Sequence, residues 1–237
     1  MALTLNYWNG RGLMEIPRIM LAISGKFPGE DYVDARHSSP CDNLEANLGR
    51  MPVITVGSES VGQSAAINFY VATECGLMGS STLEGAQIIA ICEHLKELMD
   101  AYRTLLPWGQ EPDAKNLDKW FNEGAMDVTG PAVGQDRSIR YLHWFAGRIE
   151  ACLGSNGFAV GSKLSLADVF INYVFAETLS AEQAPPDFPK YRREPFGDKE
   201  RTDAALQRYP KIKASCDAVD SNANVVKWRQ IRGVQGF

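Results

Sequence analysis

The hydrophobic pattern of this 237-residue chain changes character once, near residue 80, and that change constrains the fold more than any other feature. Before it, short strand-like runs alternate with helix-like segments. After it, apolar residues recur only at steps of three and four, which is the spacing of an amphipathic helix. The sequence therefore predicts an α/β domain over residues 1–80, followed by an all-helical domain over 85–237, with the boundary within 77–84.

Local signals set the order of elements in the first part. Alternating residues mark strands, and Gly57-Ser58 is the turn of a hairpin. Ser64 is a good N-cap, and Pro17 is tolerated if it lies in the first turn of its helix. The expected elements are a strand at 3–7, a helix from about 13 to 25, a strand at 31–35, a hairpin over 51–62 and a helix over 64–74.

The second part shows helical periodicity in separate stretches, which centre on 88–102, 139–153, 166–174 and 206–216. Residues 180–203 differ, because they contain four prolines among many charges. We expect this stretch to be a long loop insertion at the surface. The alternative is a flap near a substrate pocket.

Composition excludes several classes of function. The formal net charge of −5 argues against a general nucleic-acid binder, which needs a basic surface. Five scattered cysteines without a C-x-x-C pair, and three separated histidines, predict no metal site and no dithiol redox motif. No apolar run is long enough to span a bilayer and no signal peptide is evident, so a cytoplasmic location without membrane attachment is expected.

Four segments in order resemble the cytosolic glutathione S-transferases of the tyrosine type, with the sigma class most similar and alpha and mu nearby. Each segment alone is weakly specific, whereas the set covers both predicted domains. The segments are LTLNYWNGRGLMEIPR at 3–18, GRMPVITV at 49–56, VGQSAAINFYVA at 61–72 and GSKLSLADVF at 161–170. The resemblance implies a thioredoxin-like N-terminal domain, glutathione as co-substrate without another cofactor, and a homodimer.

The resemblance also assigns the catalytic role to Tyr7. The reactive species is the glutathione thiolate, whereas an ordinary thiol with a pKa of about 8.5 is mostly protonated at neutral pH. A tyrosine hydroxyl that donates a hydrogen bond to the sulfur stabilises the anion, and lowering the thiol pKa by two units requires about 2.7 kcal/mol. The alternative is a tyrosine that merely packs at the end of a strand.

The same resemblance gives the residues that would bind glutathione. Gln63 and Ser64 would hold its γ-glutamyl carboxylate at a helix N-terminus, where backbone N–H groups and the helix dipole favour an anion; plain helix capping by Ser64 is the alternative. Met51, before a cis Pro52, would pair with the cysteinyl backbone. The remaining candidates are Arg11 and Arg50, the latter for the glycyl carboxylate unless it is a solvated surface residue.

A second, apolar electrophilic substrate is expected beside the thiol. By resemblance its pocket is lined by Trp8, Leu13, Met99, Tyr102 and Trp108, and core packing is an equal alternative for each. Ser165 and Asp168 belong to folding instead, as a helix cap whose loss costs about 1 kcal/mol or more.

Two positions depart from the family pattern. Leu13 stands where sigma and alpha members usually carry an arginine, and Lys96 stands where an aspartate often reaches glutathione across the dimer. These departures leave two alternatives to a transferase open. They are a non-enzymatic relative such as a ligand carrier or an S-crystallin, and a glutathione-dependent prostaglandin isomerase.

Overall fold

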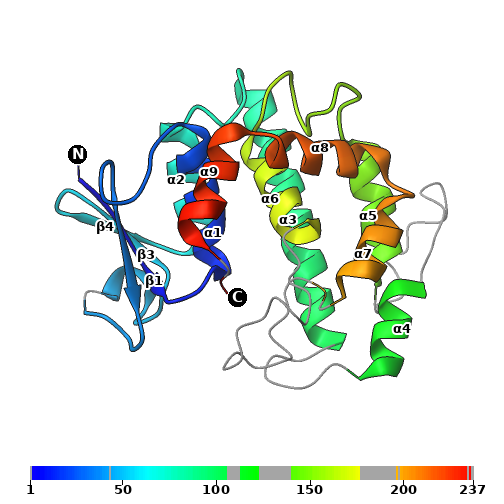
Figure 1. Cartoon of the computed structure of the whole chain (residues 1–237), viewed down its shortest axis with the longest axis horizontal. Coiled ribbons are helices and arrows are strands. Elements are labelled where there is room, and N and C mark those ends of the chain that lie inside the picture. The colour runs from blue at the N-terminus through cyan, green and yellow to red at the C-terminus, as the bar shows by residue number, and fades with distance from the viewer. Residues whose placement is uncertain are drawn as a thin grey trace. The chain divides into compact units, whose positions relative to one another are not determined.

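The computed structural model describes residues 2–42, 44–105, 113–122, 140–176, 196, 198–233 and 235 (Figure 1). The chain divides into two compact units. The first comprises Met1–Met78 together with Asp220–Phe237, and the second comprises Gly79–Val219. The C-terminal segment 220–237, which the sequence analysis grouped with the helical domain, is therefore part of the first unit.

The first unit contains a four-stranded mixed sheet in the order β2-β1-β3-β4. Its strands are β1 (Leu3–Trp8), β2 (Val33–His37), β3 (Val53–Val56) and β4 (Glu59–Gly62). Strand β1 is parallel to β2 and antiparallel to β3, and β3 and β4 form the predicted hairpin. The strand predicted at 31–35 lies two residues later, because its alternation continues to His37 opposite Trp8.

Three helices accompany this sheet: α1 (Glu15–Ile23), α2 (Ser64–Glu74) and α9 (Ala223–Arg232). Helix α1 contacts both α2 and α9 (Figure 1), and almost all of its residues are buried. A short 3₁₀ turn at Gly12–Met14 leads into α1, so Pro17 lies in the first turn, as predicted. A second 3₁₀ turn, at Glu45–Asn47, lies between β2 and β3.

The expected N-cap of α2 is wrong by one residue. Gln63 is the N-cap, with φ +66° and ψ +122°, and Ser64 is the first helical residue. The cap is the last residue outside helical geometry, and here the non-helical conformation falls on Gln63. Ser64 therefore presents its own N–H and hydroxyl at the open end of the helix.

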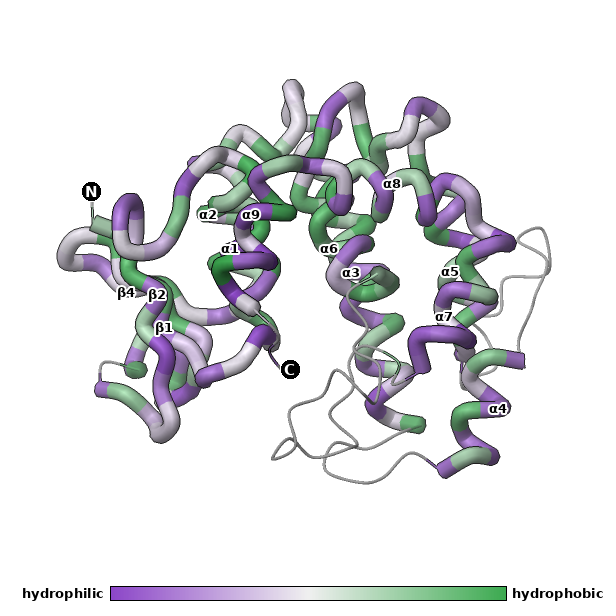
Figure 2. Tube along the Cα trace, viewed as in Figure 1, coloured by the Kyte–Doolittle hydropathy of each residue, from purple (hydrophilic) through white to green (hydrophobic). Residues whose placement is uncertain are grey.

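All the regular secondary structure in the described residues of the second unit is helical. It consists of α3 (Thr82–Leu105), α4 (Ala114–Asn122), α5 (Leu142–Cys152), α6 (Leu166–Phe175), α7 (Lys199–Leu206) and α8 (Pro210–Asp220), the last of which ends at the boundary of the unit. Helix α6 is apolar over most of its length (Figure 2) and packs against α3.

Part of the expected loop at 180–203 is helical. Residues 199–203 belong to α7, where Asp198 caps the helix by accepting a hydrogen bond from the Arg201 N–H at 3.0 Å. The cap lets a helix begin within this charged stretch, where the spacing of apolar residues does not predict one. Residues 180–195 and 197 of the expected loop lie outside the described residues.

Ser165 and Asp168 form the predicted capping box at the start of α6. The buried Asp168 carboxylate accepts hydrogen bonds from the Ser165 N–H at 2.9 Å and the Ala159 N–H at 2.7 Å. It also accepts from the Ser215 hydroxyl on α8 at 2.7 Å. One side chain thus ties together the loop before α6, α6 itself and α8.

Candidate functional site

The sheet brings most of the predicted glutathione-binding residues to one edge. Strands β1, β2 and β4 end at this edge and β3 begins there, because Asn6 is paired with Val53 and Val53 with Gly62. The edge therefore carries Tyr7 near the end of β1, Met51-Pro52 before β3, and Gln63-Ser64 after β4. These segments are far apart in sequence, and the strand register alone makes them neighbours.

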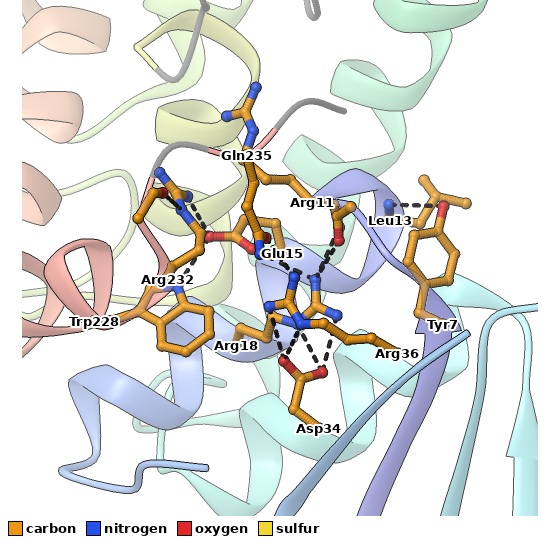
Figure 3. A network of polar contacts seen from close by, with 12 residues as sticks. Tyr7, Arg11, Leu13, Glu15, Arg18, Asp34, Arg36, Trp228, Arg232 and Gln235 are labelled. Carbon is orange, nitrogen blue, oxygen red and sulfur yellow. Dashed lines mark hydrogen bonds and ion pairs between the residues drawn. The ribbon is translucent and has the colours of Figure 1, made fainter. Parts of the chain in front are cut away.

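Tyr7 is held by the turn that follows it. Its phenol oxygen accepts a hydrogen bond from the Leu13 backbone N–H at 3.2 Å (Figure 3), and its side chain is buried, with 8% of the residue exposed. Gly12, with φ +41°, lies against the ring, since a Cβ there would come within 2.5 Å of the Tyr7 Cε1 and hydroxyl. The backbone of the turn thus fixes the position of the hydroxyl, and the accepted hydrogen bond makes the O–H a better donor.

The side chain of Arg18 stabilises the turn that follows Tyr7. Its guanidinium donates to the carbonyl oxygens of Gly10 at 2.8 Å and Arg11 at 3.1 Å, and to the Asp34 carboxylate on β2 at 2.9 and 3.1 Å (Figure 3). The Arg18 side chain is fully buried, so its charge needs such partners. Arg36, next to it on β2, pairs with the other oxygen of Asp34 at 2.8 Å.

Glu15 links this network to the C-terminal helix. Its buried carboxylate accepts hydrogen bonds from the Trp228 indole N–H at 2.9 Å and from the Arg232 guanidinium, both on α9 (Figure 3). Glu15 also lies 3.6 Å from Arg18. The C-terminal helix is therefore connected through two buried charged residues to the turn that follows Tyr7.

The N-terminus of α2 offers a place for an anion. The positive φ of Gln63 is uncommon for a residue with a side chain and strains the backbone by roughly 1–3 kcal/mol. This conformation opens the helix at Ser64, where unpaired backbone N–H groups and the helix dipole favour negative charge. Gln63 is exposed and Ser64 half-buried, so a carboxylate can reach this end of the helix.

The Met51–Pro52 peptide is cis, as the resemblance implies. The side chain of Asn47 donates to the Pro52 carbonyl at 3.0 Å and so fixes the segment from the 3₁₀ turn before it. Arg50 is exposed next to this segment, and its Nε lies 3.4 Å from the Asn47 carbonyl. Its guanidinium can therefore meet an anion at the same edge of the sheet.

The residues predicted for the second-substrate pocket belong to both units. Trp8, 42% exposed, and the half-buried Leu13 flank Tyr7 in the first unit. Met99 and Tyr102 are buried on α3 in the second unit, where Tyr102 packs edge-on against Trp120. Trp108 lies outside the described residues.

Arg11 is almost fully buried in the turn, with 2% exposed, rather than on the surface of the site. Its backbone carbonyl is one of the two that Arg18 holds. Lys96, which stands on α3 where related proteins often carry an aspartate, is exposed. Its Nζ lies 3.9 Å from a carboxylate oxygen of Glu93.

Sequence reasoning missed four residues that organise the site: Asn47, Asp34, Trp228 and Arg232. The E-x-x-R pair at Glu15 and Arg18 was a visible signal, because its spacing places both charges on one helix face. Nothing in the sequence around Asp34, Trp228 or Arg232 indicates that these residues contact that pair. Charged residues in sequence normally indicate exposed positions, and only packing shows otherwise.

Burial shifts the pKa of several other titratable groups in the described part of the chain. Burial raises the pKa of the Cys75 and Cys92 thiols, which keeps them protonated. Burial, followed by the nearby Asp34 carboxylate, raises the pKa of Tyr32. Among the described residues, no group of three or more His, Cys, Asp or Glu side chains could hold a metal ion. Nor does this part of the chain include a helix both long and apolar enough to cross a membrane.

Comparison with known proteins supports the resemblance over the whole chain. It is 25% identical over 239 residues to a probable glutathione S-transferase of Caenorhabditis elegans, covering 98% of each chain. It is 24% identical over 235 residues to the hematopoietic prostaglandin D synthase of Gallus gallus, covering 96% of this chain and 95% of the relative. No family model matches the chain.

A solved structure has the same fold. The crystal structure of a monomeric glutathione S-transferase from the hookworm Necator americanus superposes with a TM-score of 0.73 and 24% identity, covering 100% of both chains. The predicted combination of a thioredoxin-like domain and a helical domain is thereby confirmed.

Proposed function

We propose, from the likeness to cytosolic glutathione S-transferases over the full chain, that this protein is an enzyme that transfers glutathione to small apolar electrophiles. Tyr7 activates the thiol. Its O–H donates to the glutathione sulfur and stabilises the thiolate, which attacks the electrophile. The observation that carries this proposal is the Leu13 N–H bonded to the Tyr7 oxygen, because it fixes the phenol at the sheet edge where the other predicted binding residues lie.

The tripeptide is proposed to bind along this edge. The N-terminus of α2, at Gln63 and Ser64, takes the γ-glutamyl carboxylate. The backbone of Met51, before the cis Pro52, pairs with the cysteinyl residue in the manner of an added strand. Arg50 is exposed on the same side and takes the glycyl carboxylate.

Arg11 contributes through its position rather than by direct contact. Its side chain is buried, and its carbonyl oxygen is fixed by Arg18, so it shapes the turn above the sulfur. The electrophile is proposed to meet the exposed face of Trp8, which follows Tyr7 in the chain, and the side chain of Leu13, whose backbone N–H donates to the Tyr7 oxygen. Met99, Tyr102 and Trp108 remain predicted contacts of the same substrate.

Conjugation of glutathione to chlorodinitrobenzene, measured for the parent and for Tyr7→Phe, tests the proposal. If the hydroxyl lowers the thiol pKa by two units from about 8.5, its removal reduces the thiolate fraction at pH 7 roughly 20-fold. We expect a loss of turnover of that size, retained glutathione binding, and recovery of the rate at alkaline pH. A parent that binds glutathione without turning over would instead be a carrier, and equal rates for the two proteins would exclude Tyr7 as the activator.

Ser64→Ala tests the carboxylate subsite. We expect weaker retention on a glutathione resin, because one hydrogen bond to a charged group, worth about 1.5–3 kcal/mol, is lost. Thr73→Ala is the matched control, since Thr73 also carries a hydroxyl on α2 but donates it to the Phe69 carbonyl within the helix. Equal retention of all three proteins would remove Ser64 from the subsite.

We also propose a homodimer, by likeness to the family. The hookworm relative is described as monomeric, so the oligomeric state is a separate question from the activity. Sedimentation velocity of the full chain answers it, and a monomer at micromolar concentration would rule out a stable dimer.

A further inference from the structure

Helix α9 ends a buried chain of contacts that begins at Tyr7 (Figure 3). The Tyr7 oxygen is fixed by the Leu13 N–H, and the turn between these residues is fixed by Arg18 through the carbonyls of Gly10 and Arg11. Every member of this chain lies in the first unit, although the contacts from Glu15 to α9 span more than 200 residues of sequence.

Arg18 already has two sets of hydrogen-bond acceptors, the turn carbonyls and the Asp34 carboxylate. It donates to the turn carbonyls at 2.8 and 3.1 Å, while Glu15 lies 3.6 Å away, beyond hydrogen-bond distance. Trp228 and Arg232 both donate to Oε1 of Glu15, whereas Oε2 faces Arg18 and has no hydrogen-bond partner among the described residues. The two α9 donors therefore hold the carboxylate in place by one oxygen. If either donor were lost, the Glu15 carboxylate would be drawn toward Arg18, the buried cation 3.6 Å from its other oxygen.

We propose that Trp228 and Arg232 are positioning residues for Tyr7: by holding Oε1 of Glu15, and through the charge of Arg232, they leave Arg18 to hold the turn that orients the phenol. The C-terminal helix is then part of the thiol-activating machinery, although none of its residues needs to touch glutathione. This inference rests on the proposed function for its kinetic consequence, while its structural consequence can be measured without glutathione.

The principal test uses Arg232→Gln and Trp228→Phe, each in the full-length chain. We expect the turnover with chlorodinitrobenzene at neutral pH to fall about 2- to 30-fold, the range of coupling through such networks. We also expect the pH–rate profile to move toward alkaline pH, with most of the rate recovered there. A general loss of folded protein would instead lower the rate at every pH. Arg232→Lys keeps the positive charge and should restore much of the neutral-pH rate.

Arg229→Gln is the matched control. Arg229 lies on the last turns of the same helix and pairs with a carboxylate, but its partner is Asp220 at 2.7 Å rather than Glu15. We expect this variant to keep the pH–rate profile of the parent. An equal shift for Arg229→Gln and Arg232→Gln would show that general loosening of α9, and not the contact with Glu15, is responsible.

A double-mutant cycle separates positioning from independent effects. In a Tyr7→Phe background, Trp228→Phe should produce little further change in the pH–rate profile, because the hydroxyl that it positions is already gone. Full additivity of the two substitutions would overturn the proposal, as would an unshifted profile in both α9 variants.

Hydrogen exchange of the Leu13 amide gives a readout that does not depend on catalysis. This N–H donates to Tyr7, so its protection should fall in Arg232→Gln and stay unchanged in Arg229→Gln. If glutathione does not bind at all, the proposed function fails while this measurement still decides the inference. Unchanged protection of Leu13 in Arg232→Gln would refute the structural link.

Discussion

The close contact between Gly12 and Tyr7 makes Gly12→Ala the most direct perturbation of the activating turn. A Cβ at this position would lie 2.5 Å from the Tyr7 Cε1 and hydroxyl and 2.9 Å from Cζ. The backbone cannot relax easily, because Arg18 holds the two preceding carbonyls. Either the turn or the phenol must therefore move.

The expected cost has two parts. Alanine in a left-handed conformation costs roughly 1–2 kcal/mol, and overpacking of a buried contact adds roughly 1–3 kcal/mol. Gly57→Ala supplies the matched control, since Gly57 also has a positive φ, of +63°, but nothing lies within 4 Å of its added Cβ. The difference in stability between the two variants isolates the steric part.

Urea denaturation measures this difference as a shift in midpoint between the two variants. We expect Gly12→Ala to be less stable than Gly57→Ala by roughly 1–3 kcal/mol. We also expect its turnover to fall by 10-fold or more, because a displacement near 1 Å at a catalytic group can cost about 100-fold. Gly57→Ala should retain its turnover. Equal stability of the two variants, with full turnover in Gly12→Ala, would refute the idea that the turn sets the position of the hydroxyl.

Three further predictions address other parts of the molecule. Asp168→Ala should lower the free energy of unfolding by roughly 2–4 kcal/mol in urea, because it leaves the buried N–H groups of Ala159 and Ser165 without their acceptor; a loss below about 1 kcal/mol would contradict this role. Burial, followed by the charge of a nearby arginine, lowers the pKa of His143 from its ordinary value of 6.5. The unfolded chain therefore binds a proton at this histidine more readily than the folded chain does. The free energy of unfolding should fall as the pH drops below about 6.5. His143→Gln should reduce this loss between about pH 7 and pH 5, and an unchanged slope would count against it. Gln63→Gly should raise thermal stability slightly, by up to about 1 kcal/mol, while weakening glutathione binding in calorimetry, because it relieves the backbone strain and removes the side chain; a loss of stability would show that the strain is not present.

Much of the fold was predictable because local periodicity carries it. The β3–β4 hairpin and the span of α2 follow from residues adjacent in sequence, and the structure places them where the pattern predicts. The capping box of Ser165 and Asp168 is likewise local, since its two members are one helical turn apart.

The candidate site was predictable only in part. Tyr7, the cis Pro52 and the start of α2 were identified by resemblance, and the strand register then brought them to one edge. Short patterns could not predict the later start of β2 or helix α7, because neighbouring strands and an N-cap decide those boundaries rather than hydrophobic spacing.

Local patterns in the sequence predicted the change from a mixed sheet to helices and most elements of the first unit, and the resemblance predicted the residues that would bind glutathione. Only the tertiary structure decided that Glu15 and Arg18 are buried and that Trp228 and Arg232 complete their network. The physical reason is that a charged side chain can leave water only where oppositely charged and hydrogen-bonding partners converge on it. Those partners come from α1, β2 and α9, and no local pattern in the chain records that they meet.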